Sequence, residues 1–262
     1  MIWVLQLPAP LVGFLAIVIT VGLAVLGLAV SRRIVRHERL EATSTVAEQI
    51  FTLAGVLYAV LVAFVVVVVW EQFDQAQKDT ESEAVAISDL LRDSEGLPPA
   101  VRPAIQQSLI AYINDVVNDE FPRMRRGEPI EQQSDHLTRV WQSFLQVQPV
   151  TEREISFYRE SITRLDDLGS ARKSRISSSQ SEIPGEMWVM LLGGGAVMLI
   201  FTYLFGTPDL VLHGVLIALA GALLAFVLYL IFAMEHPFVG TIAVGSDPYL
   251  HALETWSQLA PK

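Results

Sequence analysis

Few residues in this sequence carry chemistry, and those that do are scattered. The chain has five histidines and no cysteine. His37-Glu38 begins like the helical zinc motif in which a second histidine follows four residues after the first, but Glu41 stands at that position. The absence of cysteine excludes disulfides and thiolate metal sites. The sequence therefore predicts no metal site and no cofactor.

Patterns that serve catalysis are missing as well. Asp166-Asp167 is a carboxylate pair in a predicted exposed helix, where such pairs are most often solvated. Gly193 to Gly195 lie within an apolar block and lack the Lys-Ser/Thr that completes a phosphate-binding loop. No serine stands in a nucleophile elbow. We therefore predict no catalytic residues and a protein that is not an enzyme.

The charge of the chain limits its partners. Asp and Glu number 28 against 18 Lys and Arg, which gives a formal net charge of −10, and the excess acid lies between residues 71 and 186. A nucleic acid needs a basic surface, so nucleic acid is excluded as a partner. Apolar residues make up 52% of the sequence and fall into blocks. That distribution is typical of a membrane protein.

Four apolar blocks are long enough to cross a bilayer, whose hydrocarbon core of about 30 Å needs roughly 20 helical residues. They are Leu11–Val30, Ile50–Trp70, Met187–Gly206 and Leu210–Met234. The first block is too long for a signal peptide and has no basic stretch before it, so we expect it to be retained. The sequence predicts a multi-pass membrane protein with the lipid bilayer as its partner.

Small and polar residues within the blocks predict how the spans pack. Gly214, Ala218 and Ala222 recur every four residues and predict a ridge for close helix contact, and the three glycines from Gly193 predict another. His213 lies near a span end, where we expect its tip to reach water. The spans lack the buried carboxylates of ion-coupled transporters, which argues against that class.

Residues 71–186 show the pattern of a water-exposed helical domain. The second span continues as a long helix that ends at Gly96, followed by Pro98-Pro99. We expect a second helix to stop before Pro122. A third has an apolar stripe, and Thr151 with Glu154 forms a capping box that opens a fourth. The stripes of the four helices are Phe73, Gln77, Thr80, Ala84, Ile87 and Leu91; Ile105, Leu109, Ile113 and Val116; Leu137, Val140, Trp141, Phe144 and Leu145; and Ile155, Tyr158, Ile162 and Leu165.

The predicted fold is all-α: a polytopic membrane protein with four transmembrane helices and a helical extramembrane domain between the second and third. We divide the chain into a first span pair (1–70), the helical domain (71–186), a second span pair (187–234) and an amphipathic tail (235–262). In the tail, Asp247-Pro248 predicts the start of a short helix with Leu250, Leu253 and Trp256 on its apolar face.

Basic residues do not decide which side of the membrane the helical domain faces. The short first loop contains four of them, Arg32, Arg33, Arg36 and Arg39. The flanks on the opposite side of the membrane also contain four, Lys78, Arg172, Lys173 and Arg175. The positive-inside rule gives weight to short loops and slightly favours an outside domain.

Three segments resemble the bestrophin-like domain family of bacterial membrane proteins. They are Ala54 to Phe64 leading into Trp70-Glu71-Gln72-Phe73, Phe201 to Gly206, and Glu235-His236-Pro237-Phe238-Val239-Gly240 followed by Asp247-Pro248. The resemblance extends from about Arg32 to Ala252. Bestrophins proper are pentameric anion channels with four spans per subunit and a cytoplasmic helical domain, and their second span forms the pore neck.

The resemblance implies a homo-oligomer, a pentamer in the bestrophins, in which the second span lines a pore for small anions. It implies Phe51, Gly55, Tyr58 and Phe64 as pore-lining candidates, and Glu235, His236, Pro237, Phe238 and Gly240 as the post-span motif. The motif has an inserted residue and lacks the acidic run of the bestrophins, which puts calcium binding in doubt. The simpler alternative is that Gly55 and Tyr58 pack span against span and that Pro237-Phe238 ends a helix.

Two functions stay open at this point. The first is an oligomeric anion channel in the bacterial inner membrane. The second is a non-conducting scaffold or sensor that acts through its extramembrane domain. The resemblance places that domain in the cytoplasm, whereas the arginines of the first loop slightly favour the outside.

Overall fold

A computed structural model describes residues 9–34, 37–205, 209–240 and 242–259, and the described residues form helices and no strand. Four helices are long and apolar enough to cross a membrane. They are α1 (Ala9–Ile34), α2 (His37–Asp93), α7 (Gly185–Tyr203) and α8 (Leu210–Glu235). The predicted all-α fold with four spans is confirmed. The third span ends at Tyr203, earlier than predicted, and Gly206, its predicted end, lies outside the described residues.

The chain forms two compact units. The membrane unit consists of the described residues of 7–71 and 182–235, and the helical unit consists of those of 72–181 and 236–262. Each unit therefore takes residues from both halves of the chain, and the segment after α8 groups with the helices between α2 and α7. The division of the chain made from sequence stays a prediction.

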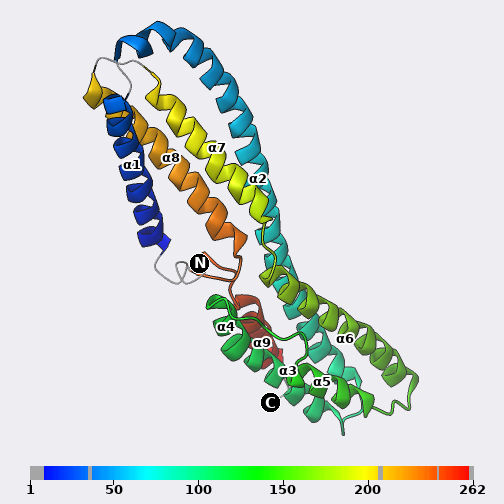
Figure 1. Ribbon diagram of the computed structural model, residues 1–262. Coiled ribbons are helices and arrows are strands. Elements are labelled where there is room, and N and C mark those ends of the chain that lie inside the picture. The colour runs from blue at the N-terminus through cyan, green and yellow to red at the C-terminus, as the bar shows by residue number, and fades with distance from the viewer. Residues whose placement is uncertain (1–8, 35–36, 206–208, 241, 260–262) are drawn as a thin grey trace. The chain divides into compact units, whose positions relative to one another are not determined.

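In the membrane unit, α1 packs along α8, and α7 lies beside both (Figure 1). Ala24, Leu28 and Ile217 are buried between α1 and α8. A Cβ on Gly221 would lie 3.5 Å from the Cβ of Ala24, so a small residue suits this crossing. The predicted ridge is therefore misplaced by about one residue, because nothing lies within 4 Å of a Cβ on Gly214.

The helical unit has one apolar core. It is formed by the second part of α2 with α3 (Arg102–Asp115), α5 (Asp135–Leu145), α6 (Glu152–Ser179) and α9 (Asp247–Leu259). Most members of the four predicted stripes are buried or packed against this core. Leu145 is an exception at 67% exposure, although its neighbour Phe144 is fully buried in the core.

Side chains cap the helices of this unit where the sequence predicted it. The Thr151 hydroxyl accepts from the Glu154 N–H at 3.2 Å and the Glu154 carboxylate accepts from the Thr151 N–H at 3.0 Å, so the capping box is formed. Ser134, which was not predicted as a cap, caps α5 by a single bond in which its hydroxyl accepts from the Leu137 N–H at 3.3 Å. After α2 a 3₁₀ turn, η2 (Ser94–Gly96), ends the helix, and a Cβ on Gly96 would collide with the Phe157 ring.

The prediction that the second helix stops before Pro122 is wrong. A π-helical turn, η3 (Val116–Glu120), follows α3 directly, and α4 (Phe121–Arg125) follows η3 without a break. The N–H of Phe121 bonds to the carbonyl of Val116, five residues back. Pro122 sits in the first turn of α4, where its missing N–H costs little. The wider turn lets the chain remain helical across a proline.

Candidate functional site

Two of the predicted pore-lining residues pack against α7 of their own subunit. The Phe51 ring stands edge-on to Phe205 at 5.3 Å and tilted to Phe201 at 6.4 Å between ring centroids. The Tyr58 hydroxyl donates to the carbonyl of Leu191 at 2.9 Å. These contacts fix the rotation of α2 about its axis, because both side chains must face α7.

Glycines make room for the Tyr58 ring. A Cβ on Gly194 would lie 2.7 Å from two ring carbons, and one on Gly195 would lie 3.0 Å from the hydroxyl oxygen. Gly55, one turn before Tyr58 on α2, has the Met198 methyl 3.3 Å from its Cβ position. Gly194 and Gly195 therefore act as the predicted packing glycines, whereas nothing lies within 4 Å of a Cβ on Gly193.

Phe64 lies on a different face of α2. Its side chain is 75% exposed in the isolated chain, as expected of a residue that no other span of the same subunit covers. A row of large apolar side chains shares this exposure and recurs at helical spacing. The row, called here the free face of α2, consists of Leu53, Val56, Leu57, Val60, Phe64 and Val67.

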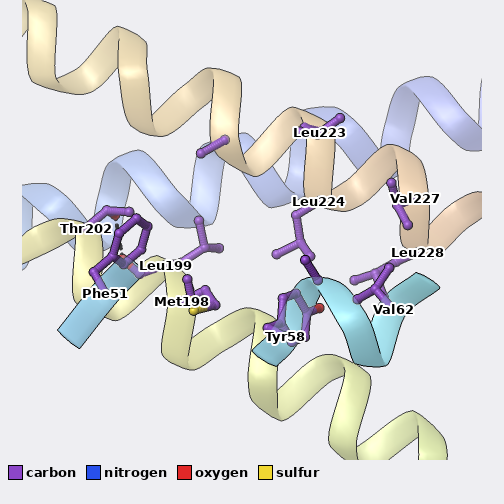
Figure 2. A pocket seen from close by; sticks show the side chains of 12 residues that line it. Phe51, Tyr58, Val62, Met198, Leu199, Thr202, Leu223, Leu224, Val227 and Leu228 are labelled. Atoms are coloured by element: carbon purple, nitrogen blue, oxygen red, sulfur yellow. Dashed lines mark hydrogen bonds between the residues drawn. The ribbon is translucent and has the colours of Figure 1, made fainter. Parts of the chain in front are cut away.

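An apolar groove runs between α2, α7 and α8 and has a volume of about 290 Å³. Figure 2 shows that Phe51, Tyr58 and Leu224 reach into it from two of these helices. The full lining consists of Phe51, Tyr58, Ala59, Val62, Met198, Leu199, Thr202, Ala220, Leu223, Leu224, Val227 and Leu228. Its rim at Leu223 is exposed, so the groove opens sideways from the helices.

A second pocket of about 330 Å³ shares Phe51 and Thr202 with the groove. It is polar at one side, where Glu48 and His213 line it. Nη2 of Arg32 lies 3.0 Å from Nδ1 of His213, and Nε2 of His213 lies 3.0 Å from the carbonyl of Thr202. Because a guanidinium can only donate, Nδ1 accepts and Nε2 carries the proton.

The expectation that His213 reaches water is wrong. Its side chain is 3% exposed, and its two ring nitrogens hold α1 and α7 to the start of α8. Nothing in the sequence indicates Arg32 as its partner, because 181 residues separate them. The two hydrogen bonds of His213 form only when the fold brings the ends of α1 and α7 to opposite sides of its ring.

Glu235, the first residue of the post-span motif, belongs to the membrane unit. Its buried carboxylate accepts from the backbone N–H of Ile183 at 3.0 Å and from Nε1 of Trp188 at 3.1 Å. These bonds hold the end of α8 to the start of α7. The carboxylate thus has a structural role within the membrane unit.

The rest of the motif belongs to the helical unit and forms a tight loop. The N–H of Val239 donates to the carbonyl of His236 at 3.0 Å, and that of Val244 donates to the carbonyl of Pro237 at 2.7 Å. Gly240 has φ of 84°, a left-handed value that glycine adopts without strain. Phe238 is buried with its ring edge-on to Phe121 at 6.0 Å. Each motif residue therefore has a role in packing or turn formation.

Two of the three residues predicted for the apolar face of α9, Leu253 and Trp256, pack against the core of the helical unit. Tyr249 and Ala252 are buried, and Leu250 is exposed. The Tyr249 ring lies edge-on to Phe121 at 5.7 Å. The buried face of α9 is therefore wider than predicted on the side of Tyr249 and Ala252, and it does not include Leu250.

Two arginines and two glutamates form a buried cluster in the helical unit, called here the charge cluster. Arg175 of α6 donates from Nε to Glu83 of α2 at 2.7 Å and from Nη2 to Glu120 of η3 at 2.6 Å. Arg172 donates from Nη1 to both carboxylate oxygens of Glu120, at 2.6 and 2.7 Å. The Tyr112 hydroxyl donates to Glu83 at 2.5 Å. The cluster is electrically balanced and links three helical segments.

Electrostatics within the cluster keep Glu120, Arg172 and Arg175 ionised, because the pKa of Glu120 is lowered and the pKa values of both arginines are raised. Burial by itself would raise the pKa of Glu120, but the guanidiniums of Arg175 and Arg172 outweigh burial and lower that pKa. Burial would lower the pKa of Arg175, yet Glu83 and Glu120 hold it well above its ordinary value. Burial, followed by the nearby Glu83 carboxylate, raises the pKa of Tyr112. Ion pairs and hydrogen bonds thus offset the cost of burying four charges.

Sequence reasoning missed the charge cluster and counted Arg172 and Arg175 as groups flanking the membrane. One available signal was their spacing, since Leu165, Leu168, Arg172 and Arg175 follow the three-four period of one buried face of α6. Asp166 and Asp167 are exposed on the opposite side, as predicted. Among the described residues no group of three His, Asp or Glu side chains is placed to hold a metal ion.

Comparison with known proteins identifies the fold. The sequence profile of the Bestrophin-like domain family matches residues 18–249. A crystal structure of a point mutant of a bacterial bestrophin homologue from Klebsiella pneumoniae superposes with a TM-score of 0.70 at 15% identity, and the match covers 94% of this chain and 99% of that one. A crystal structure described as that of a mutated membrane protein gives 0.64 at 16% identity, with coverage of 92% and 98%.

A second point mutant of the Klebsiella pneumoniae homologue gives a TM-score of 0.62 at 16% identity, with coverage of 93% of this chain and 98% of that one. At these identities the superpositions establish the fold alone. No curated protein sequence matches the chain. The family match spans most of the sequence and includes the second part of the first apolar helix, the other three apolar helices and the post-span motif. The chain is therefore a member of the Bestrophin-like domain family and a membrane protein with the bestrophin fold.

Proposed function

We propose that the protein assembles into a ring of subunits that conducts small anions across the bacterial inner membrane, with α2 as the innermost helix. Four spans in one chain are too few to enclose a pore, so conduction requires an oligomer. Membership of the family supports this assignment, because bestrophins proper are pentameric anion channels. The helical unit then lies in the cytoplasm, as in those channels.

The free face of α2 is the observation that carries the proposal. One side of α2 is committed to α7 and α8 through Phe51 and Tyr58, which leaves the opposite side for neighbouring subunits or a pore. Its exposed residues are apolar, and an apolar constriction can gate an anion pathway by excluding water. Phe64 is the largest side chain of this face and is the proposed constriction. Phe51, Gly55 and Tyr58 then shape the pore indirectly, by setting the rotation of α2.

Planar-bilayer recording of the purified oligomer in a potassium chloride gradient tests the proposal. We expect currents whose reversal potential lies toward the chloride equilibrium potential. Phe64→Ala widens the proposed constriction and should raise the single-channel conductance. Phe14→Ala on α1 is the matched control, because Phe14 is also an exposed aromatic residue of a span, at 63%, and should leave the conductance unchanged.

Two results would overturn the assignment. A monodisperse oligomer that gives no selective current would favour the non-conducting scaffold or sensor. Equal effects of the Phe64 and Phe14 substitutions would remove α2 from the pore lining. The mass of the complex in detergent, measured beforehand, distinguishes a silent oligomer from a monomer that cannot form a pore.

A further inference from the structure

The apolar groove and the polar pocket of the membrane unit together have the layout of an amphiphile site. They share Phe51 and Thr202, so the apolar groove and the polar pocket adjoin each other. At the polar end Arg32 bonds His213, and His213 bonds the carbonyl of Thr202. The ends of α1 and α7 and the start of α8 therefore meet there, at what corresponds to one headgroup level of a bilayer.

The length of the groove matches one leaflet. On α2 its lining runs from Phe51 to Val62, a separation of eleven residue steps that spans about 17 Å at the helical rise of 1.5 Å per residue. Half of a hydrocarbon core of about 30 Å is about 15 Å. An acyl chain that enters at the headgroup level would therefore reach about the bilayer midplane at Val62.

The groove suits a slender apolar occupant. A volume of about 290 Å³ admits an aliphatic chain or a few side chains but not the body of a helix, which is about 10–12 Å in diameter. The lining offers almost no polar surface, and the Tyr58 hydroxyl is already bonded to Leu191, so an aliphatic chain leaves no polar group unsatisfied.

Charges at the polar end select the headgroup. Glu48 lines the pocket and is exposed, and no described side chain forms an ion pair with its carboxylate. His213 lines the same pocket, and the Arg32 guanidinium bonds to His213. A headgroup with an ammonium near Glu48 and a phosphate near Arg32 complements both charges. A headgroup that carries phosphate alone would meet Glu48 as a like charge.

We infer that this groove is a specific site for one phospholipid with an ammonium-bearing headgroup, of the phosphatidylethanolamine type. One acyl chain lies between α2, α7 and α8, and the headgroup sits between Glu48 and the Arg32–His213 pair. The site does not depend on conduction, and binding is measured without current. Failure of the channel proposal therefore leaves this inference standing, and the reverse also holds.

Native mass spectrometry tests the site with the purified full chain incubated in equimolar phosphatidylethanolamine and phosphatidylglycerol. We expect one retained phospholipid per chain, with phosphatidylethanolamine preferred by about two- to fivefold, as for a partly exposed charge pair. Glu48→Gln should remove the preference. Glu71→Gln, a matched exposed acid at the other end of the apolar stretch of α2, should leave it unchanged.

A second pair of variants tests the groove itself. Leu224→Trp fills the space beside Tyr58 and should abolish lipid retention. Leu219→Trp adds the same bulk at an exposed position of α8 outside the groove and should retain the lipid. Equal helical content of the two variants by circular dichroism excludes misfolding as the cause.

Three results would overturn the inference. They are unchanged lipid retention in the Leu224 variant, equal retention of both phospholipids by the wild type, and dissociation of the oligomer by Leu224→Trp. The last result would assign the groove to a neighbouring subunit.

Discussion

Removing Arg175 from the charge cluster should unfold the helical unit at a much lower temperature. Arg175→Met keeps the aliphatic stem of the side chain but leaves Glu83 and Glu120 without the guanidinium that both carboxylates share. Arg175 and Glu83 are both 0% exposed, so water cannot replace the lost bonds. Removing one partner of a buried ion pair lowers the free energy of unfolding by about 3–5 kcal/mol. At about 3 °C per kcal/mol for a unit of this size, Tm should fall by about 10 °C.

The stability difference between the wild type and the Arg175 variant should also depend on pH, in a direction that follows from the pKa of Glu120. In the wild type the pKa of Glu120 is lowered, so its contribution to stability is present above the unfolded-state value of about 4.3 and is lost as pH falls through the folded value. In the variant Glu120 keeps only Arg172 of its two guanidiniums, so its ionised form is less stabilised and it takes up a proton more readily. The stability difference between wild type and variant should therefore shrink as the pH falls from about 7 to about 4.

Circular dichroism of the full chain in detergent, scanned with temperature at several pH values, measures both effects. Arg164→Met is the control, because Arg164 lies on the same helix and forms only exposed ion pairs, with Asp89, Glu160 and Asp167. Its loss should cost less than about 1 kcal/mol. Equal losses in the two variants, or a difference that does not change with pH, would refute the reasoning.

Three further predictions concern the glycines and the orientation of the chain. Gly194→Ala should destabilise the membrane unit by about 1–3 kcal/mol, because its methyl group meets the Tyr58 ring, whereas Gly193→Ala should be neutral; thermal denaturation in detergent measures both. Gly240→Ala should cost about 1–2 kcal/mol in the same assay, because its φ of 84° strains any residue with a Cβ. Val150→Cys, an exposed position in a chain without cysteine, should react with an impermeant maleimide only after the cells are permeabilised, since we propose a cytoplasmic helical unit.

Each of these predictions has an outcome that contradicts it. Equal stability of the Gly194 and Gly193 variants would show that α2 and α7 are not held by the Tyr58 contact. An unchanged Tm for the Gly240 variant would show that the loop after α8 relaxes at no cost. Labelling of Val150→Cys in intact cells would place the helical unit outside, as the arginines of the first loop slightly favour.

The parts of the fold that depend on residues close together in the sequence were predictable from sequence. A charge-free apolar block of about 20 residues is stable only in hydrocarbon, so the four spans could be recognised without knowing their partners. The capping box at Thr151 was predictable for the same reason, because donor and acceptor lie within one helical turn. Local rules also predicted the end of α2 at Gly96.

Features that depend on distant partners were missed. Arg172 and Arg175 look like surface charges until Glu120 and Glu83 are known to lie beside them, 52 and 92 residues away in sequence. His213 looks interfacial because nothing in its own helix indicates Arg32. A helix end at Pro122 is the natural prediction because sequence patterns do not show that the preceding turn can widen.

The candidate site was predictable only in part, and for a related reason. Apolar positions of α2 all look equivalent in sequence, and only the rotation of the helix separates those that face α7 from those that face away. Tyr58 and Phe64 differ in this respect, since one bonds to Leu191 and the other is uncovered. The assignment of all four aromatic and glycine positions to the pore stays a prediction.

The π-helical turn η3 contains one residue more than an ordinary helical turn between the same two hydrogen-bonded groups. The N–H of Phe121 bonds to the carbonyl of Val116 five residues back, whereas in an α-helix this bond spans four residues. Deleting one residue between Val116 and Asp119 would therefore let the same two groups bond as in an α-helix, and Glu120 would still face Arg172 and Arg175. A frame-preserving loss of a single codon would thus be tolerated in η3, because the wider turn absorbs the extra residue locally.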